Sequence, residues 1–263
     1  MALARFEDVV VGRPDLRIPF PQNFRARLTG QTMLALTRRA KYLVAPLSSG
    51  ETLVMHLGMS GSFRVDVDAG DEDQSTMKTD AGLRHDHVVF HMSSGAIVTF
   101  NDPRRFGFMD LVLTEKLATH AVFSTLGPEP LSDEFNADTL ARACKGKRTS
   151  LKVALLDQRI VAGLGNIYVS EALHVARLSP QRQASTIATV AGRPRESAWR
   201  LAAAIKQVLT EAIDRLSATA YRSSRFRVYD REGERCRRRG CGGTIRRRTQ
   251  AGRSTFFCPV CQR

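Results

Sequence analysis

The sequence contains no long hydrophobic run. Its apolar stretches extend over only a few residues, whereas a membrane-spanning helix needs roughly 20, so we expect no membrane span. The first residues, MALARFEDVVVGRPDLR, include no apolar segment of the kind found in secretion signals. No internal repeat is present, and the one biased segment is rich in arginine. A composition of 43% hydrophobic and 25% charged residues over 263 positions predicts a globular protein of one to two domains.

Acidic residues are scarce relative to basic ones. Asp and Glu number 26 against 40 Lys and Arg, which gives a net charge of +14. Residues 222–263 hold thirteen arginines and only three acids, so 13 − 3 = +10 of this charge lies in the last 42 residues. A basic block of this kind usually contacts a polyanion such as DNA, RNA or an anionic membrane. The alternative is a solvated face or a basic tail, but the cysteines inside the block argue against a plain tail.

The spacing of apolar residues changes near the middle of the sequence. Residues 1–113 are β-rich: KYLVAPL and TLVMHLGMSG flank a Ser-Gly turn, and HDHVVFHM and AIVTF repeat that pattern. The polar, acidic segment 67–82 is expected to be an exposed loop. After STLGPEPLS (124–132), apolar residues recur three and four apart, which predicts helices in SDEFNADTLARAC, TSLKVALLDQ, YVSEALHVARL and ESAWRLAAAIKQVLTEAIDRL. Ser132 and either Thr149 or Ser150 are the expected N-caps.

The five cysteines divide into a cluster and a single residue. An odd number without a secretion signal favours a reducing compartment, so we expect a cytoplasmic protein. Cys236 and Cys241 form one close pair and Cys258 and Cys261 another, a spacing that suits one zinc ion held tetrahedrally by four thiolates. A short terminal segment with few apolar residues needs such a metal in order to fold, so the zinc is predicted to be structural. Cys144 is expected to be a partly buried helix residue.

Several ordered segments resemble the formamidopyrimidine-DNA glycosylases, the bacterial enzymes that excise oxidised purines. The resemblance runs from about Arg13 to the end of the chain. It rests on RRAKYL (38–43), MHLGMSGSFR (55–64), HDHV (85–88), NDPRRFG (101–107), LGPEPLS (126–132), LLDQRIVAGLGNIYVSEAL (155–173) and the finger TIRRRTQAGRSTFFCPVCQ.

The resemblance implies a multi-domain α+β protein. It predicts an N-terminal β-sandwich at 1–115, a linker at 116–130, a helix–two-turns–helix domain at 131–225 and a zinc β-hairpin at 226–263. The implied activity is base-excision repair: a monomer binds damaged double-stranded DNA, flips out an oxidised purine such as 8-oxoguanine, releases it as a glycosidase and nicks the strand as a lyase by β,δ-elimination. Flipping is required because the glycosidic carbon is inaccessible inside a stacked duplex.

The resemblance also implies roles for individual residues. Lys41 matches a lysine near the reacting sugar, and Arg253 matches an arginine that holds phosphates and assists the second elimination. Three side chains, Met59, Arg104 and Phe106, match those that fill the gap left by the flipped base. The implied contacts to the DNA backbone come from His85, Lys147 or Arg148, Lys152 and Asn166.

The sequence departs from the family pattern at two places. Family members begin with Pro-Glu, whose proline nitrogen attacks the sugar, and continue into a first helix. This sequence begins MALARFEDVV, so we expect the proline, the glutamate and that helix to be absent. Three interpretations remain: a start that lies upstream, an inactive paralogue that binds damaged DNA, or a different nucleophile such as Lys41. The segment 214–225 is also shorter than the family's base-capping loop, which leaves lesion preference open. A ribosome- or RNA-associated role is a further alternative that rests on charge alone.

Overall fold

The computed structural model describes residues 3–67, 84–218 and 226–263. The chain forms two compact units, Met1–Ser124 and Thr125–Arg263. The division between them falls inside the segment 116–130 that the sequence marks as a linker. Most of the loops expected at 67–82 and 214–225 lies outside the described residues. Within the described part of the chain, no helix has the length and hydropathy needed to cross a membrane.

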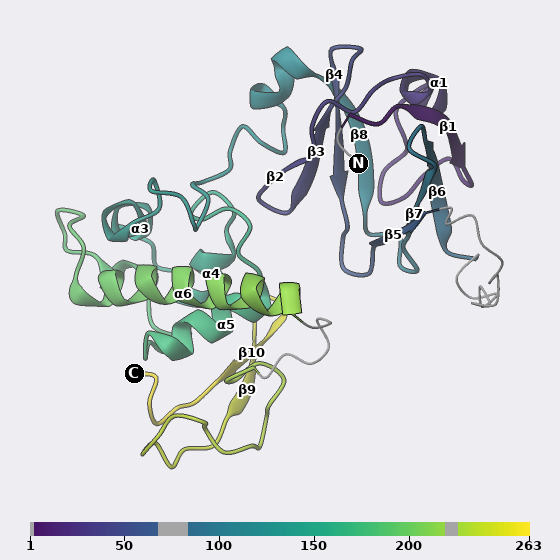
Figure 1. The fold of residues 1–263 in the computed structure, drawn as a ribbon. Helices are drawn as coiled ribbons and strands as arrows, with labels where there is room; N and C mark the ends of the chain where they lie inside the picture. Colours follow the sequence, from purple (N-terminus) through teal and green to yellow (C-terminus); the bar gives the residue numbers. More distant parts are fainter. Residues whose placement is uncertain (1–2, 68–83, 219–225) are drawn as a thin grey trace. The chain divides into compact units, whose positions relative to one another are not determined.

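The first unit is a sandwich of two antiparallel four-stranded sheets (Figure 1). One sheet has the order β1-β6-β7-β5 and the other β2-β3-β4-β8. A short helix, α1 (Phe24–Leu28), and a 3-10 turn, η1 (Thr114–Thr119), accompany the sheets. The strands are β1 (Phe6–Val11), β2 (Thr37–Arg39), β3 (Tyr42–Pro46), β4 (Glu51–His56), β5 (Ser62–Val67), β6 (Asp86–Met92), β7 (Ala96–Asn101) and β8 (Phe108–Leu113).

The two hairpins expected from the sequence are confirmed. β3 pairs with β4 and β6 pairs with β7, with Gly50 and Gly95 at positive φ in the connecting turns. Their inward side chains, among them Leu53, Phe90 and Phe100, are almost fully buried between the sheets. An apolar cavity of about 190 Å³ remains in this core.

The second unit is built from helices around a separate core (Figure 1). Its helices are α3 (Ala137–Cys144), α4 (Leu151–Leu156), α5 (Asn166–Val175), the 3-10 turn η2 (Ala184–Ile187) and α6 (Glu196–Ala218). The four expected helices are therefore present, but the expected N-cap Ser132 is wrong. Asn136 caps α3 instead, in a reciprocal capping box with Thr139, because this residue and not Ser132 stands next to the first helical turn. Ser150 does precede α4, although its side chain makes no capping bond.

A two-stranded hairpin completes the second unit. β9 (Arg246–Gln250) pairs antiparallel with β10 (Arg253–Phe257), and the turn between them places Ala251 and Gly252 at positive φ. Its own core is small, with Val228, Ile245 and Phe256 buried beside the cysteines. Cys144, at the end of α3, belongs to the helical core and is fully buried, and burial raises the pKa of its thiol to about 11.

Candidate nucleic-acid interface and metal centre

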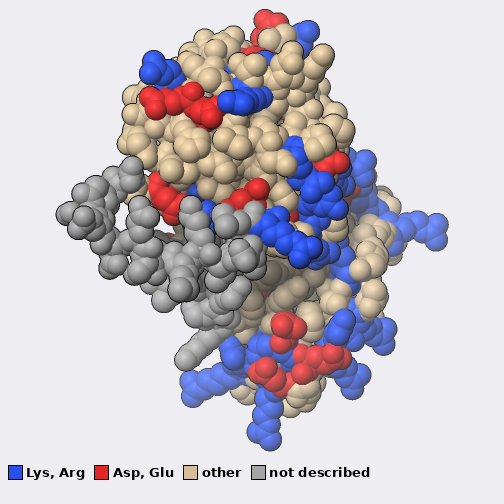
Figure 2. Space-filling model, turned by 90° about the vertical axis from the view of Figure 1, so that its right-hand side faces the viewer, with Lys and Arg blue, Asp and Glu red and all other residues tan. Residues whose placement is uncertain are grey.

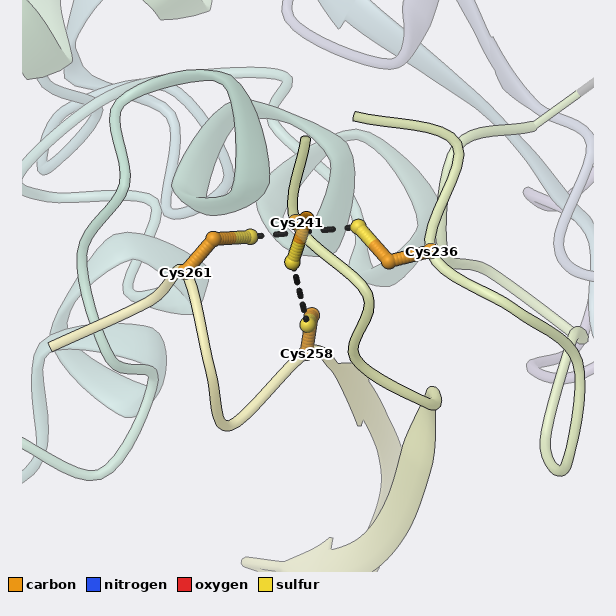
Figure 3. A group of neighbouring side chains, drawn as sticks. All are labelled: Cys236, Cys241, Cys258 and Cys261. Carbon is orange, nitrogen blue, oxygen red and sulfur yellow. Dashed lines mark hydrogen bonds between the residues drawn. The ribbon is translucent and has the colours of Figure 1, made fainter. Parts of the chain in front are cut away.

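Four cysteines converge at the base of the hairpin (Figure 3). Their Sγ atoms all lie within 4.8 Å of one another, with Cys241 and Cys258 at 3.5 Å and Cys236 and Cys261 at 3.9 Å. Zinc–sulfur bonds of about 2.3 Å in a tetrahedron place sulfurs roughly 3.8 Å apart, so the four thiols fit one zinc ion. Burial and the neighbouring thiols raise the pKa of Cys261, so its thiolate form needs a cation beside it.

The metal centre is supported from α5. His174 is buried, and its Nε2 lies 3.3 Å from Cys236 Sγ. Burial, and then the positive charge of Arg238, lowers the pKa of His174 to about 4, so the ring is neutral at pH 7. A neutral ring that donates from Nε2 to the sulfur stabilises a thiolate ligand and fixes its orientation. No sequence pattern indicates this contact, because the two residues are 62 positions apart.

Two predicted DNA-binding residues, Lys152 and Asn166, lie with the predicted catalytic residue Arg253 at the tip of the hairpin. Lys152 on α4 donates from Nζ to the carbonyl oxygen of Ser254 (3.1 Å) and to Thr255 Oγ1 (2.8 Å). Asn166, the first residue of α5, donates from Nδ2 to the same Ser254 oxygen at 3.0 Å. Arg253 directly precedes Ser254 in the chain, and its side chain is exposed. We call Lys152, Asn166, Arg253 and Ser254 the hairpin-tip cluster.

The hairpin-tip cluster is cationic and partly desolvated. The Lys152 side chain is fully buried, and its pKa is lowered to about 8, first by burial and then by the charge of Arg253. Asn166 Oδ1 is buried and has no hydrogen-bond partner among the described residues. The backbone N–H groups at the start of α5 and the exposed Arg253 add further donors. This combination can bind the phosphates of a nucleic acid.

A buried carboxylate ties the finger to the helical core. Glu171 on α5 accepts three backbone N–H bonds, from Arg227 (2.8 Å), Val228 (2.8 Å) and Tyr229 (3.0 Å). Its side chain is almost fully buried. These bonds fix the segment through which the chain enters the finger, and sequence reasoning missed them because they join residues 56 to 58 positions apart.

The first unit has its own group of predicted site residues, on two loops that lie against each other. One loop follows β4 and carries Met59, and the other precedes β8 and carries Arg104 and Phe106. A Cβ added to Gly58 would lie only 2.4 Å from the carbonyl carbon of Phe106, so this close approach and the positive φ of Gly58 require glycine.

The fully buried Asp102 holds these two loops together. Its Oδ1 accepts a 2.5 Å hydrogen bond from Ser60 Oγ and its Oδ2 accepts a 2.8 Å bond from the Gly107 amide. The Arg104 amide in turn donates to Ser60 Oγ at 3.3 Å. The motif containing Asp102 was recognised in the sequence, but the role of this carboxylate was not, because Ser60 is 42 positions away.

The side chains carried by these loops are exposed. Met59 is 73% exposed and Phe106 is 41% exposed, which is unusual for large apolar residues beside a complete core. The Arg104 guanidinium lies 4.5 Å from the centre of the Phe106 ring, so the two form a cation–π pair. An apolar wedge with an arginine beside it can replace a flipped base in a DNA stack and contact the base opposite.

The remaining predicted residues lie on other segments, and the carbonyl oxygen of one of them, His85, accepts a 3.0 Å hydrogen bond from the Asp102 amide. Lys41 is exposed in the turn between β2 and β3, and His85 is half-buried directly before β6. Lys147 and Arg148 lie between α3 and α4, where Arg148 is exposed and Lys147 half-buried. The structure thus groups Met59, Arg104 and Phe106 in one unit and Lys152, Asn166 and Arg253 in the other. In the lower part of Figure 2, Lys and Arg side chains surround a smaller group of Asp and Glu.

The first unit is a β-sandwich with an exposed Met-Arg-Phe group, and the second combines helices with a four-cysteine hairpin and a cationic cluster at its tip. This architecture is that of a DNA-binding protein of the helix–two-turns–helix class. Three family models match: the formamidopyrimidine-DNA glycosylase N-terminal domain over residues 2–109, the H2TH domain of the same enzymes over 126–223, and a zinc finger found in FPG and IleRS over 233–263. The chain belongs to the formamidopyrimidine-DNA glycosylase family.

Individual relatives agree with this assignment. The chain is 54% identical to a formamidopyrimidine-DNA glycosylase of Rhodopseudomonas palustris, a match that covers 99% of this chain and 93% of the relative. It is 56% identical to one from a Bradyrhizobium species, over 95% and 90% of the two chains. Among solved structures, the Lactococcus lactis enzyme bound to DNA with an abasic site matches with a TM-score of 0.83 and 28% identity, covering 100% and 94%. The fold predicted from the resemblance is therefore confirmed, as is the zinc finger with its four cysteines.

Proposed function

We propose that this chain removes oxidised purines from duplex DNA and then nicks the strand. The observation that carries the proposal is the identity above 50%, over nearly the whole chain, to relatives named formamidopyrimidine-DNA glycosylase. A solved Lactococcus lactis relative is described in complex with DNA that contains FAPY-dG. The proposal includes damaged double-stranded DNA as the partner, one structural zinc ion and action in the bacterial cytoplasm. It also includes the division into domains at 1–115, 131–225 and 226–263.

The two groups of site residues have different roles in this proposal. The hairpin-tip cluster binds the phosphates on either side of the lesion, with His85 and Lys147 or Arg148 as further backbone contacts. Met59, Arg104 and Phe106 enter the gap that the flipped nucleotide leaves. Filling the gap offsets part of the unstacking cost, which is a few kcal/mol for a base.

The chemical step needs an uncharged amine. The amine nitrogen attacks the sugar C1′, the glycosidic bond breaks, and the base leaves with the bonding electrons and a proton. The ring then opens to give an imine between the amine and C1′, and eliminations at the 3′ and 5′ C–O bonds detach the sugar and leave a phosphate on each strand end. Lys41 is the lysine of the described chain that the resemblance places near this sugar. Arg253 is proposed to hold the phosphates during the second elimination.

Borohydride trapping tests the proposal. A duplex with one 8-oxoguanine or one abasic site is incubated with the chain and sodium borohydride, which reduces an imine to a stable covalent adduct. We expect an adduct whose position peptide mapping identifies, and Lys41→Gln removes it if Lys41 is the amine. A lesion-dependent gel shift without any adduct or nick would contradict the enzyme and support the alternative, a zinc-dependent module that binds damaged DNA. Stronger binding to RNA than to damaged duplex would contradict both.

A further inference from the structure

A second cationic site lies in the helical unit, away from the hairpin-tip cluster. It is a hollow of about 490 Å³ between the finger, the end of α5 and α6, and five of its lining residues are arginines: Arg177, Arg200, Arg238, Arg239 and Arg263. Figure 1 shows the C-terminus beside this end of α5, and the Arg263 amide donates to the Arg177 carbonyl oxygen at 3.3 Å. We call these five residues the arginine hollow.

Acidic side chains compensate little of this charge. None of the described residues that line the hollow is Asp or Glu. Arg200 forms an ion pair with Glu196 at 3.6 Å, but Glu196 is 84% exposed, so solvent screens the pair strongly. The adjoining Arg182 has its pKa lowered by burial and by the positive charges of Arg200 and Arg195. The main-chain oxygen of Arg263 accepts from the Ser179 amide at 3.1 Å and from Arg182 Nη1 at 3.5 Å, so the negative charge at this end of the chain is already bound. The charge of the five arginines exceeds it, and the net positive charge is available to an anion.

The guanidinium of Arg238 is held in place by hydrogen bonds to the end of α5. Its Nη2 donates to the carbonyl oxygens of His174 (2.5 Å) and Val175 (3.3 Å) at the end of α5, where the helix dipole favours a cation. Its Nε is buried and has no hydrogen-bond partner among the described residues. Buried donors without an acceptor are rare, so an anion oxygen that reaches this guanidinium would gain a strong bond.

The metal centre fixes the backbone of the hollow. Cys241 and Cys261 line the hollow and also belong to the group of four zinc-binding thiols. The four residues between Cys236 and Cys241 are three arginines and a glycine, and Gly240 has a positive φ of 73° in the turn. Four residues separate Cys236 from Cys241, whereas two separate Cys258 from Cys261. The longer spacing of the first pair leaves room for Arg238 and Arg239, which line the hollow. Arginines on a preformed backbone lose less freedom on binding than those on a flexible tail.

The hollow and the hairpin-tip cluster occupy opposite ends of α5. Asn166 is the first residue of this helix, and Arg238 contacts its last residues. Ten residues at 1.5 Å each separate the two ends by about 15 Å. A phosphate bound in the hollow is therefore not one of those held by Asn166 and Lys152.

We propose that the arginine hollow binds the phosphodiester backbone of a second segment of duplex DNA, distinct from the segment held at the lesion. Guanidinium groups bind phosphate oxygens in a bidentate manner, and every cationic side chain among the described lining residues is an arginine. The choice of DNA over an acidic protein rests on the proposed function, because a protein that acts on duplex DNA is already bound to this polyanion. A second contact of this kind would hold the protein near DNA between encounters with lesions.

The test compares two triple variants of the whole zinc-loaded chain. One carries Arg177→Gln, Arg200→Gln and Arg239→Gln, which removes exposed charges from the hollow and spares Arg238. The control carries Arg142→Gln, Lys145→Gln and Arg193→Gln, which removes the same charge from exposed positions of the same unit outside the hollow. Binding to a lesion-free duplex of about 30 base pairs, long enough for two contacts, is measured at several salt concentrations. Zinc content and excision from a lesion duplex are measured in parallel, to verify folding and the lesion site.

We expect the hollow variant alone to lower the slope of log K against log[salt] by about 2 to 3, since each phosphate contact contributes about 0.9. It should keep one zinc per chain and unchanged single-turnover excision. Equal slopes for the two variants would overturn the inference, as would poly-glutamate that competes at the hollow as well as DNA does. If the unmodified chain excises nothing, the proposed function fails, but the comparison of slopes still decides whether the hollow binds DNA.

Discussion

The two units present their functional residues by different physical means. In the sandwich, one buried carboxylate, Asp102, holds the loops that carry Met59, Arg104 and Phe106, and a large apolar core lies beneath them. In the helical unit, Arg253 stands on a hairpin whose own core is small and whose base is a metal centre. The residues proposed to enter the DNA therefore depend on a local polar anchor, whereas those proposed to bind phosphate depend on zinc.

Removal of the metal should have the largest effect, because it should unfold part of the helical unit and leave the fold of the sandwich unchanged. Cys258→Ser deletes one of four ligands, and structural zinc contributes about 10–16 kcal/mol to the folding of comparable fingers. We expect loss of zinc, unfolding of residues 226–263 and loss of DNA binding, whereas the sandwich keeps its fold. Metal analysis and hydrogen exchange resolved by segment would measure this, with Cys144→Ser as the control for a cysteine outside the centre. One zinc per chain in Cys258→Ser would refute the assignment.

Asp102→Asn should release the loops of the sandwich. The amide cannot accept both bonds that the carboxylate accepts, and a buried unsatisfied donor costs about 1–3 kcal/mol. We expect faster hydrogen exchange at 58–61 and 103–107 and weaker lesion binding, with zinc content unchanged. Asp66→Asn, on the exposed side of β5, is the matched control. Equal exchange in the two variants would show that Asp102 does not anchor the loops.

Glu171→Gln should loosen the finger without removing its metal. The glutamine keeps one oxygen for the amides of 227–229 and places an NH2 group against another of them, at a cost of about 1–3 kcal/mol. We expect faster zinc release to a chelator, with Glu196→Gln as the exposed control on α6. Unchanged release kinetics would mean that the finger is held by its metal alone.

The smallest effect concerns the pH dependence of Lys152. Its pKa in the folded state, about 8, lies below the ordinary value of 10.5, so between these values the unfolded chain binds more protons and stability rises with pH. DNA affinity should change in the opposite direction and fall above pH 8, because the amine loses the charge that attracts phosphate. Urea titrations and binding curves at about pH 7 and pH 9.5, on either side of the folded pKa, should show both trends, and Lys152→Met should lose them. Parallel trends in Lys152→Met would assign them to another group.

The sequence predicted the local elements better than the contacts between them. Alternating apolar residues sufficed for the hairpins β3–β4 and β6–β7, and cysteine spacing sufficed for the metal ligands. The cap of α3 was misplaced, since several polar residues precede that helix and only its backbone geometry selects Asn136. The contacts of Asp102 with Ser60 and of Lys152 with Ser254 join residues 42 and 102 positions apart. No periodic pattern encodes such pairs.

The most direct test of the proposed activity is to measure base release and strand cleavage separately on a duplex with a single 8-oxoguanine. Mass spectrometry detects the free base, and a denaturing gel detects the nick. We predict both products from the unmodified chain, and from Arg253→Ala we predict base release with less cleavage. Lesion-specific binding without any free base would contradict the proposed activity and leave a DNA-damage-binding protein.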